Sequence, residues 1–389
     1  MRITHVITRL VVGGAQENTI ASVHGLRQQP GFDLKLISGP SIGPEGSMES
    51  EVADVPGLLA LVPELVRPVH PWKDWIALRR LTRIFQQTRP HLVHTHSGKA
   101  GILGRMAAAR TRVPIVIHHI HGPSFGPFQG ALANAVFTAA ERYAARFTDH
   151  FFCSAQAMTD LYLSAGIGVP AQYTRVFSGF DVDAFRNVPD AAALRARLGF
   201  SPADFVIGKI GRITALKGHG DLLRAVRDLL PHVANARILF VGDGSLRQQV
   251  ETQARELGLA NRVTFTGLAA PADVPGYISA MDCVAHLSYR EALSRALPQA
   301  LAAGKPIIAY NFAGANEVCM NGQTGFLVDV GAIATVTQCL LKLAQDPGLG
   351  AVLGKRGQEL VAENFTVENM VRQQAEVYRR LAREKGISP

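Results

Sequence analysis

Short runs rich in β-branched residues alternate with helical stretches along the whole chain, and this alternation limits the possible folds more than any other feature. In the first half the predicted strands are 2–8, 34–38, 58–63, 91–96, 114–120, 150–154 and 174–178. Helical periodicity fills the gaps, as over 72–88 and 130–147. The pattern restarts with predicted strands at 205–213, 237–244, 262–268, 283–288, 305–311 and 325–330. Such alternation is typical of parallel sheets, so we expect an α/β protein.

The length of the chain and one polar stretch point to two domains. At 389 residues the chain exceeds the size at which a single hydrophobic core stops growing. A polar, alanine-rich stretch between Gly179 and about Phe205 separates the two series of strands. We predict domains at 1–187 and 188–365, with a C-terminal helix at 366–389 that packs back toward the first domain. Two facing sheets of this kind create a ligand-binding cleft at the carboxyl ends of their strands.

Cysteine usage and the N-terminal sequence bear on the compartment. None of the four cysteines forms a CxxC pair, which suits buried thiols in a reducing compartment. The first residues, MRITHVITRL, lack the length and apolar core of a signal peptide. No stretch reaches the roughly 18 consecutive apolar residues of a transmembrane helix. We expect a soluble, cytoplasmic protein, with the inner face of the cytoplasmic membrane as an alternative location.

Positive charge is concentrated in one part of the chain. The stretch from Arg67 to Arg112 holds ten Lys or Arg residues against one acid, Asp74. Such a patch attracts nucleic acid, anionic lipid or a phosphorylated substrate, or is merely a solvated surface. Within it, 71–87 predicts an amphipathic helix that carries Trp72 and Trp75 beside three arginines. We expect this helix to pack on the first core, with membrane docking through its rim as the alternative.

Two turns between a strand and a helix are candidate phosphate sites. The first strand is followed by VVGGAQENT, in which Gly13 and Gly14 open a helix. Paired glycines let backbone amides approach a phosphate, although a tight turn explains them equally well. The second series of strands begins with GRITALKGHGDLL, where Arg212 follows a strand and Lys217 precedes a helix. Two cations at a helix N-terminus predict an anion site in which the side chains dominate.

The segment 288–318, SYREALSRALPQALAAGKPIIAYNFAGANEV, is the most informative part of the sequence. It resembles the donor-binding signature of retaining glycosyltransferases of the GT-B fold, specifically glycosyltransferase family four. That signature has two glutamates separated by seven residues. Glu291 matches the first, whereas Gln299 stands where the second is expected. The other matching positions are Ala302, Ala303, Gly304, Lys305, Pro306, Gly314, Glu317, Asn321, Gly322 and Gly325.

The resemblance covers nearly the whole chain, because GGAQ, HTHSGKAG, GRITALKGH, VGDGSLR and further segments have family counterparts in the same order. It implies the GT-B fold, in which two Rossmann-like domains face each other across a cleft. It also implies a retaining, hexosyltransferase-type enzyme that takes a sugar from a nucleotide-diphosphate sugar. HTHSGKAG looks most like members that build bacterial polysaccharides on a lipid carrier. The acceptor stays unknown, with a lipid-linked saccharide as one candidate and peripheral membrane association as another possibility, and no nucleic-acid partner is expected.

The resemblance also implies roles for individual residues. Arg212 and Lys217 would hold the donor diphosphate and neutralise the charge of the departing nucleotide. Glu291 would contact hydroxyls of the donor sugar, and His121 would face that sugar from the first domain. The donor-binding residues that it implies are Gly13, Gly14, Gly242, Ala292, Leu293, Ser294 and Gln299. Retention in this family is attributed to front-face attack, so catalysis would rest on electrostatics and positioning, with no metal and no other cofactor.

Two patterns resemble metal sites. Asp181 and Asp183 form a DxD, but they lie in the predicted linker and match the family pattern Asn-Gly-Ile-Asp-x-x-x-Phe. Two predicted strand ends carry the histidines His94, His96, His118, His119 and His121, in which alternate residues share a face. A metal-dependent hydrolase would also need placed carboxylates, which this part of the sequence lacks. We expect no metal at either place.

Three other functions compete with glycosyl transfer. Departures from the family signature at Ala292, Ser294 and Gln299 leave room for a noncatalytic protein that binds sugar nucleotides. A non-hydrolysing nucleotide-sugar epimerase of the same fold is the second alternative, and a metal-dependent hydrolase is the third. Donor turnover, the need for an acceptor and sensitivity to chelators separate these functions.

Overall fold

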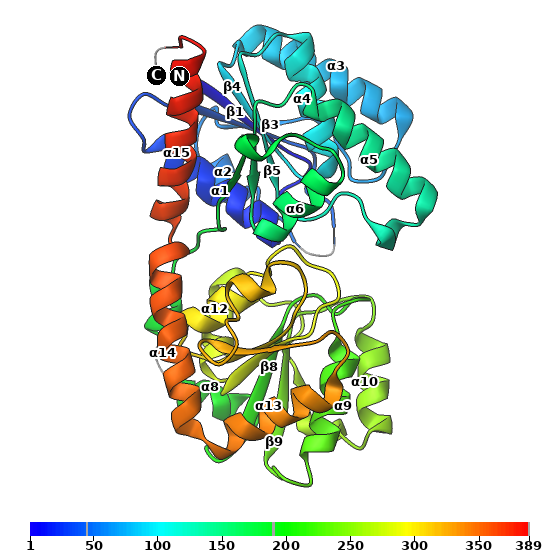
Figure 1. Cartoon of the computed structure of the whole chain (residues 1–389), viewed down its shortest axis with the longest axis vertical. Coiled ribbons are helices and arrows are strands. Elements are labelled where there is room, and N and C mark those ends of the chain that lie inside the picture. Colours follow the sequence, from blue (N-terminus) through cyan, green and yellow to red (C-terminus); the bar gives the residue numbers. More distant parts are fainter. Residues whose placement is uncertain (44–45, 189–190, 388–389) are drawn as a thin grey trace. The chain divides into compact units, whose positions relative to one another are not determined.

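The computed structural model describes residues 1–43, 46–188 and 191–387, so residues 44–45, 189–190 and 388–389 of the predicted domains lie outside it. The chain divides into two compact units (Figure 1). Unit 1 consists of Met1–Phe180 and Val367–Pro389, and unit 2 of Asp181–Thr366. The chain therefore enters unit 2 once and returns to unit 1 for its last helix.

Unit 1 is built on a seven-stranded parallel sheet with the order β3-β2-β1-β4-β5-β6-β7. Its strands are β1 (Arg2–Ile7), β2 (Asp33–Ser38), β3 (Leu59–Leu61), β4 (Leu92–His96), β5 (Ile115–Ile120), β6 (His150–Cys153) and β7 (Tyr173–Arg175). Its helices are α1 (Gly14–Arg27), α2 (Ser50–Ala53), α3 (Pro71–Thr88), α4 (Gly98–Arg110), α5 (Ala131–Ala145), α6 (Gln156–Ser164), α15 (Val367–Glu384), η1 (Pro127–Gln129) and η2 (Pro170–Gln172). Helices cover both faces of this sheet (Figure 1).

Unit 2 repeats this architecture with a six-stranded parallel sheet in the order β10-β9-β8-β11-β12-β13. Its strands are β8 (Phe205–Ile210), β9 (Ala236–Val241), β10 (Val263–Phe265), β11 (Cys283–His286), β12 (Ile307–Tyr310) and β13 (Gly325–Val328). Its helices are α7 (Asp183–Arg186), α8 (Ala191–Arg197), α9 (His219–Leu229), α10 (Arg247–Glu256), α11 (Val274–Ser279), α12 (Ala296–Ala302), α13 (Ile333–Gln345), α14 (Pro347–Asn364), η3 (Ala260–Arg262), η4 (Pro271–Asp273) and η5 (Ala313–Glu317). Two Rossmann-like units of parallel strands confirm the predicted fold class.

The predicted strands are all present, with ends that differ by up to three residues. The predicted helices at 72–88 and 130–147 are α3 and α5. The expected domain boundary after residue 187 lies seven residues beyond Phe180, because α7 packs on α11 and α12 of unit 2. No helix in the described parts of the chain combines the length and apolar character needed to cross a membrane.

The strands of unit 1 are buried on both sides because their side chains alternate between two cores. Ile3 and Ile7 of β1 belong to the core that contains α1 and α15. Val6, between them, belongs to the core that contains α3 and α4. In Figure 1, α1 and α15 lie on the left of this sheet and α3 and α4 on the right.

The helix α3 shows both expected faces but places its tryptophans on the outer one. Leu78, Leu81 and Phe85 are buried in the core that contains α4. Trp72 and Trp75 remain 64% and 45% exposed and stack with ring centroids 5.0 Å apart. The helix is therefore packed on the core, as expected, while its aromatic pair faces away from that core.

Only part of the basic stretch from Arg67 to Arg112 lies on the surface. Arg105 is fully buried and donates to the carboxylate of Glu141 at 2.5 Å, so it does not belong to an exposed patch. Lys99 pairs with Asp74 at 2.5 Å. The count of charges along the sequence overstates the patch because a buried guanidinium has a partner 36 residues away.

The C-terminal helix α15 is held in unit 1 by a close contact with α1. A Cβ atom built on Gly25 of α1 would lie 2.4 Å from Cγ2 of Val371. On the same side, Gln374 Nε2 donates to Ser22 Oγ at 3.0 Å. The missing side chain at Gly25 therefore lets the two helices approach each other.

This contact predicts that Gly25→Ala destabilises the protein, although alanine normally favours a helix over glycine by about 1 kcal/mol. Overpacking costs about 1–3 kcal/mol, so the midpoint of urea unfolding should fall. In a Val371→Ala background the same substitution should be neutral or stabilising. The control is Gly350→Ala in α14, where a Cβ would meet its nearest neighbour at an ordinary 3.7 Å. An equal rise in midpoint for Gly25→Ala and Gly350→Ala would contradict the close contact.

Candidate functional site

The loops after β8 and β11 lie side by side at the carboxyl edge of the unit 2 sheet. The amide of Tyr289 donates to the carbonyl of Leu216 at 2.8 Å, and Ser288 Oγ donates to the same carbonyl at 3.1 Å. These bonds bring two of the predicted site residues, Lys217 and Glu291, together. Carboxyl edges of open α/β sheets are where such folds bind ligands.

An ion pair forms the centre of this site, because Lys217 Nζ donates to Glu291 Oε1. The Nε2 atom of His286 lies 3.7 Å from the same carboxylate oxygen. Burial alone would raise the pKa of Glu291, but His286 and Lys217 outweigh it and bring the pKa to about 2. Glu291 is therefore ionised at neutral pH and able to accept hydrogen bonds.

The backbone around Lys217 adopts a conformation that fixes where this side chain points. Leu216 has φ 66° and Gly218 has φ 68°, both in the left-handed region. A Cβ on Gly218 would lie 1.8 Å from the carbonyl oxygen of Leu287, so only glycine fits there. Gly218 is also the N-cap of α9, so the helix predicted after Lys217 begins there. Lys217 thus precedes a helix N-terminus, where backbone amides favour an anion.

Polar groups that the sequence analysis did not single out lie beneath this ion pair. Lys209, near the carboxyl end of β8, is buried, and burial together with Lys217 lowers its pKa to about 7. Asp221 of α9 accepts hydrogen bonds from Tyr289 at 2.5 Å and Tyr310 at 2.7 Å. A lysine in the otherwise apolar run FVIGKI was the available signal for this layer.

Arg212 and Gly242 belong to two loops that lock together at the same sheet edge. Arg212 follows β8 and is exposed. A Cβ on Gly242 would lie 2.3 Å from the carbonyl oxygen of Gly211. The amide of Ile213 donates to the carbonyl of Asp243 at 2.9 Å. Only glycine fits at position 242, because the two backbones approach each other closely there. This close approach also positions the loop that carries Arg212.

The predicted donor-binding residues after Glu291 form a compact turn before α12. Ala292 is buried, and its carbonyl accepts from the amide of Gly314 at 2.8 Å. Leu293 and Ser294 follow it and remain partly exposed. Gln299 lies within α12 and is half-buried. This hydrogen bond thus brings the two parts of the sequence signature, around residues 291 and 314, next to each other.

In unit 1, the predicted residue His121 follows β5 at the carboxyl edge of the sheet. Its Nε2 atom lies 3.0 Å from Nδ1 of His96, and its ring stacks on His119 with centroids 4.0 Å apart. The loop that continues from His121 is anchored by Ser124, which donates to Glu141 at 2.9 Å and accepts from Tyr162 at 2.8 Å.

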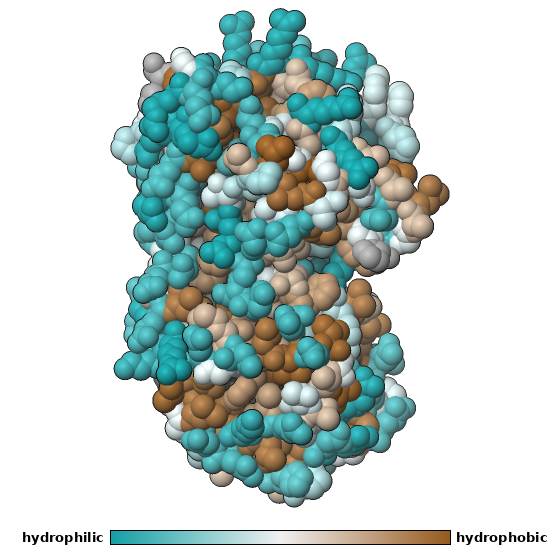
Figure 2. Space-filling view, in the orientation of Figure 1, coloured by the Kyte–Doolittle hydropathy of each residue, from teal (hydrophilic) through white to brown (hydrophobic). Residues whose placement is uncertain are grey.

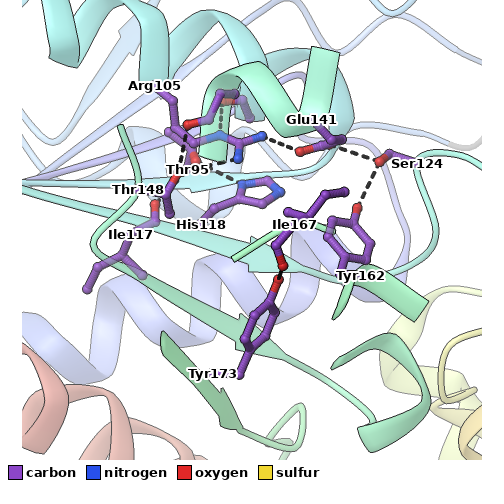
Figure 3. A network of polar contacts seen from close by, with 12 residues as sticks. Thr95, Arg105, Ile117, His118, Ser124, Glu141, Thr148, Tyr162, Ile167 and Tyr173 are labelled. Atoms are coloured by element: carbon purple, nitrogen blue, oxygen red, sulfur yellow. Dashed lines mark hydrogen bonds and ion pairs between the residues drawn. The ribbon is translucent and has the colours of Figure 1, made fainter. Parts of the chain in front are cut away.

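Figure 3 shows how this anchor continues into the interior of unit 1. Glu141 lies between Ser124 and the buried guanidinium of Arg105, which donates to it at 2.5 Å. His118 points to this side of the sheet, where its Nδ1 lies 2.9 Å from Thr95 Oγ1. A buried ion pair that is satisfied at both ends makes the position of the Ser124 loop specific.

The other predicted residues of unit 1, Gly13 and Gly14, begin α1 after the end of β1. Gly13 is the N-cap with an extended backbone, and its carbonyl accepts from the amide of Glu17 at 3.0 Å. A Cβ there would meet only the flexible end of Gln16, at 2.9 Å. The first amides of α1 therefore lie at the same sheet edge as His121, in keeping with a phosphate-binding turn.

The histidines of unit 1 include two groups whose nitrogen atoms lie close enough to share a metal, His5 with His94 and His96, and His96 with His119 and His121. The ring geometry does not favour this use. A metal lies in the plane of each imidazole that binds it, whereas the rings of His119 and His121 stack at 16°. His5 and His96 approach at 2.9 Å, shorter than the roughly 3.3 Å between two nitrogens of a tetrahedral zinc site.

The second metal-like pattern has a structural explanation. Asp181 Oδ1 accepts from the amide of Ala184 at 3.1 Å and so stabilises the start of α7. Asp183 is the first residue of that helix and lies 4.0 Å from Arg186. The Asp181 carboxylate is therefore engaged at the start of a short helix, whereas the Asp183 side chain is 80% exposed.

Comparisons with known proteins agree with this geometry. Residues 190–360 match the family described as "Glycosyl transferases group 1", and residues 13–179 match the "Glycosyl transferase 4-like domain". The chain is 25% identical over 382 residues, 97% of its length and 96% of the relative's, to the UDP-Gal:alpha-D-GlcNAc-diphosphoundecaprenol alpha-1,3-galactosyltransferase of Escherichia coli. It is 30% identical over 311 residues, 75% of its length and 68% of the relative's, to the D-inositol 3-phosphate glycosyltransferase of Rhodococcus erythropolis.

A solved structure shows the same fold. The crystal structure of HepE from Anabaena in complex with UDP and glucose superposes with a TM-score of 0.84 at 24% identity, covering 98% of this chain and all of that one. Two parallel sheets, the matches along both units and these relatives lead to one assignment. The chain belongs to the group 1 glycosyl transferases of the GT-B fold.

Proposed function

We propose that this protein is a retaining, metal-independent glycosyltransferase that moves a hexose-type unit from a nucleotide-diphosphate sugar to an acceptor in bacterial polysaccharide or glycolipid synthesis. The Lys217–Glu291 ion pair in front of α9 carries the proposal, because it combines a cation for the diphosphate with a carboxylate for sugar hydroxyls. The UDP-galactose donor in the name of the Escherichia coli relative and the UDP and glucose of the Anabaena complex support a nucleotide-sugar donor.

In the proposed reaction the bond between the anomeric carbon and the diphosphate breaks, and a bond to an acceptor oxygen forms on the same face of the sugar. The acceptor proton passes to an oxygen of the departing diphosphate. Lys217, Arg212 and the first amides of α9 stabilise the negative charge that develops on that group. Glu291 accepts hydrogen bonds from the donor sugar and holds it in place. This chemistry needs no divalent ion, because side-chain and backbone donors supply the positive potential.

The acceptor is proposed to bind unit 1 and to be a lipid-linked saccharide, as in the name of the Escherichia coli relative. Exposed apolar side chains on unit 1 support a peripheral position at the cytoplasmic membrane. They include Trp72 and Trp75 of α3 and Leu132 and Val136 of α5. Figure 2 shows apolar surface at the right edge of unit 1, where α5 lies in Figure 1. Arg79 stacks 4.6 Å from the Trp75 ring and adds positive charge beside it.

Two other functions remain as alternatives, a noncatalytic sugar-nucleotide-binding protein and a nucleotide-sugar epimerase of the same fold. Both would bind the donor through the same residues. The transferase is favoured over them because the matching relatives are glycosyltransferases along both units. Following conversion of the donor with and without acceptor distinguishes all three: the transferase needs the acceptor, the epimerase converts the donor without it, and the binding protein does not convert the donor.

Replacing Lys217 or Arg212 by Ala should lower kcat about a hundred- to thousandfold, the usual effect of losing a donor that stabilises developing negative charge. The control is Arg227→Ala on α9, because Arg227 is exposed and pairs with its neighbour Asp228 at 2.6 Å.

Transfer in excess chelator should equal transfer with added magnesium. For the two variants, activity within about threefold of wild type in folded Lys217→Ala and Arg212→Ala would contradict the proposed role of these side chains at the diphosphate. An absolute need for a divalent ion would remove metal independence.

The two positions of the glutamate signature should respond differently to exchange of acid and amide. Glu291→Gln removes the charge that Lys217 and His286 stabilise, so donor turnover should fall severely. Gln299→Glu should tighten donor binding modestly or leave it unchanged, because charge-assisted hydrogen bonds are about twice as strong as neutral ones. Donor affinity by titration calorimetry and kcat are measured for both variants. A harmless Glu291→Gln would favour the noncatalytic alternative.

Binding to vesicles tests the membrane proposal. The protein should sediment with vesicles that contain anionic lipid, and binding should weaken as salt rises, because exposed charges are screened over about 10 Å at 0.1 M. Trp72→Ala combined with Trp75→Ala should reduce this binding. Val352→Ala serves as the control, because Val352 is an exposed apolar residue on α14 of unit 2. Equal binding to neutral and anionic vesicles, or none to either, would contradict the proposal.

A further inference from the structure

Unit 1 contains a cluster of imidazole rings that extends inward from the carboxyl edge of its sheet. His5 of β1 is paired in register with His94 of β4, and His96 of β4 with His119 of β5. His121 follows at the end of β5. The first four rings are buried, and they lie on the side of the sheet that α15 covers. Of these rings, only His121, at the outer end of the cluster, has a role that the family resemblance implies.

Hydrogen bonds join His121 to α15 through the interior. His121 Nε2 lies 3.0 Å from His96 Nδ1, and His96 Nε2 lies 2.9 Å from His5 Nδ1. The chain continues from His5 Nε2 to the hydroxyl of Tyr378 at 3.3 Å, and from that hydroxyl to His94 Nδ1 at 2.5 Å. Each imidazole is therefore joined to the next through opposite nitrogens, Nε2 to Nδ1.

This arrangement couples the tautomers of the rings. Burial lowers the pKa of His5 to about 3 and lowers the pKa values of His94 and His96 well below their usual range, so these rings are neutral. A neutral imidazole has one nitrogen that donates and one that accepts. In a chain linked through Nε2 and Nδ1, every ring must then carry its proton on the same type of nitrogen. The Tyr378 hydroxyl extends this rule to His94, because it donates to one of His5 and His94 and accepts from the other.

The rings of this hydrogen-bonded chain can all carry their protons on Nδ1 or all on Nε2. The inner end of the hydrogen-bonded chain, at His94, determines which of these two arrangements is favoured. Nε2 of His94 is buried and has no hydrogen-bond partner among the described residues. A buried N–H without an acceptor is rarer than a buried acceptor without a donor. His94 should therefore keep its proton on Nδ1 and donate it to Tyr378. The hydroxyl then donates to His5, and the order continues outward with a proton on Nδ1 of His5, His96 and His121.

We propose that Tyr378, His5 and His96 are positioning residues that hold His121 as its Nδ1–H tautomer, so that this imidazole presents a hydrogen-bond donor to a sugar hydroxyl at the carboxyl edge of the unit 1 sheet. The part that concerns the sugar rests on the proposed function, whereas the tautomer is a property of the free protein. His119 lies outside the chain. Both of its nitrogens are buried without a partner among the described residues, although its ring stacks on that of His121.

The test is ¹⁵N nuclear magnetic resonance of the full chain labelled at histidine, recorded without donor. Long-range proton–nitrogen correlations report which ring nitrogen carries the proton. We expect Nδ1–H at His5, His94, His96 and His121. A proton on Nε2 of His121, or different tautomers at any two of these four, would overturn the proposal. This measurement needs neither activity nor a variant, so it fails independently of the proposed function.

A matched pair of variants then separates the hydrogen-bonded chain from simple packing. In His96→Phe the ring is kept but the link to His121 is cut, and His121 should populate both tautomers. In His119→Phe the ring stacked on His121 is kept and the chain is intact, so His121 should remain Nδ1–H. An unchanged tautomer of His121 in His96→Phe, or an equal mixture in both variants, would show that the chain does not set it.

Discussion

The ion pair between Lys217 and Glu291 depends on the loops after β8 and β11 being held against each other. Both side chains are partly withdrawn from water, where an unpaired charge is costly. The carbonyl of Leu216 accepts two hydrogen bonds from the second loop, and Gly218 allows the backbone contact with Leu287. The left-handed conformation of Leu216 is thus part of the same arrangement. Residues such as Gly242 serve the site indirectly, by allowing neighbouring backbones to approach.

The two units use buried polar groups in different ways. In unit 2 the polar layer beneath the ion pair mixes signs, with Lys209 close to the carboxylate of Asp221 and two tyrosine hydroxyls bonded to that carboxylate. In unit 1 the corresponding layer is made of neutral rings, with a separate ion pair, Arg105 with Glu141, behind the Ser124 loop. A neutral layer fixes orientation through hydrogen-bond direction, whereas a charged layer sets the ionisation of its neighbours.

Much of the fold could be predicted because parallel strands buried on both faces leave near-continuous apolar runs, such as IIAY in β12, between helical segments. The helix start at Gly218 was likewise visible in the sequence. The partners of buried polar side chains were not. Arg105 looked like surface charge because Glu141 lies on another helix, and the role of Tyr378 depends on a residue 373 positions earlier. The exposure of Trp72 and Trp75 was also hidden, since Trp75 and Leu78 share helical spacing.

The return of the chain to unit 1 at Val367 makes unit 2 an insertion in the topology of unit 1. A ribosome therefore completes unit 2 before it has synthesised α15, the helix that supplies Tyr378 and covers one side of the first sheet. Until then the apolar face of α1 and the imidazoles of β1 and β4 lack their cover. The segment 181–366 contains unit 2 in one piece, whereas no continuous fragment that omits unit 2 contains the whole of unit 1. The synthesis of unit 1 thus begins first, but its core is completed last.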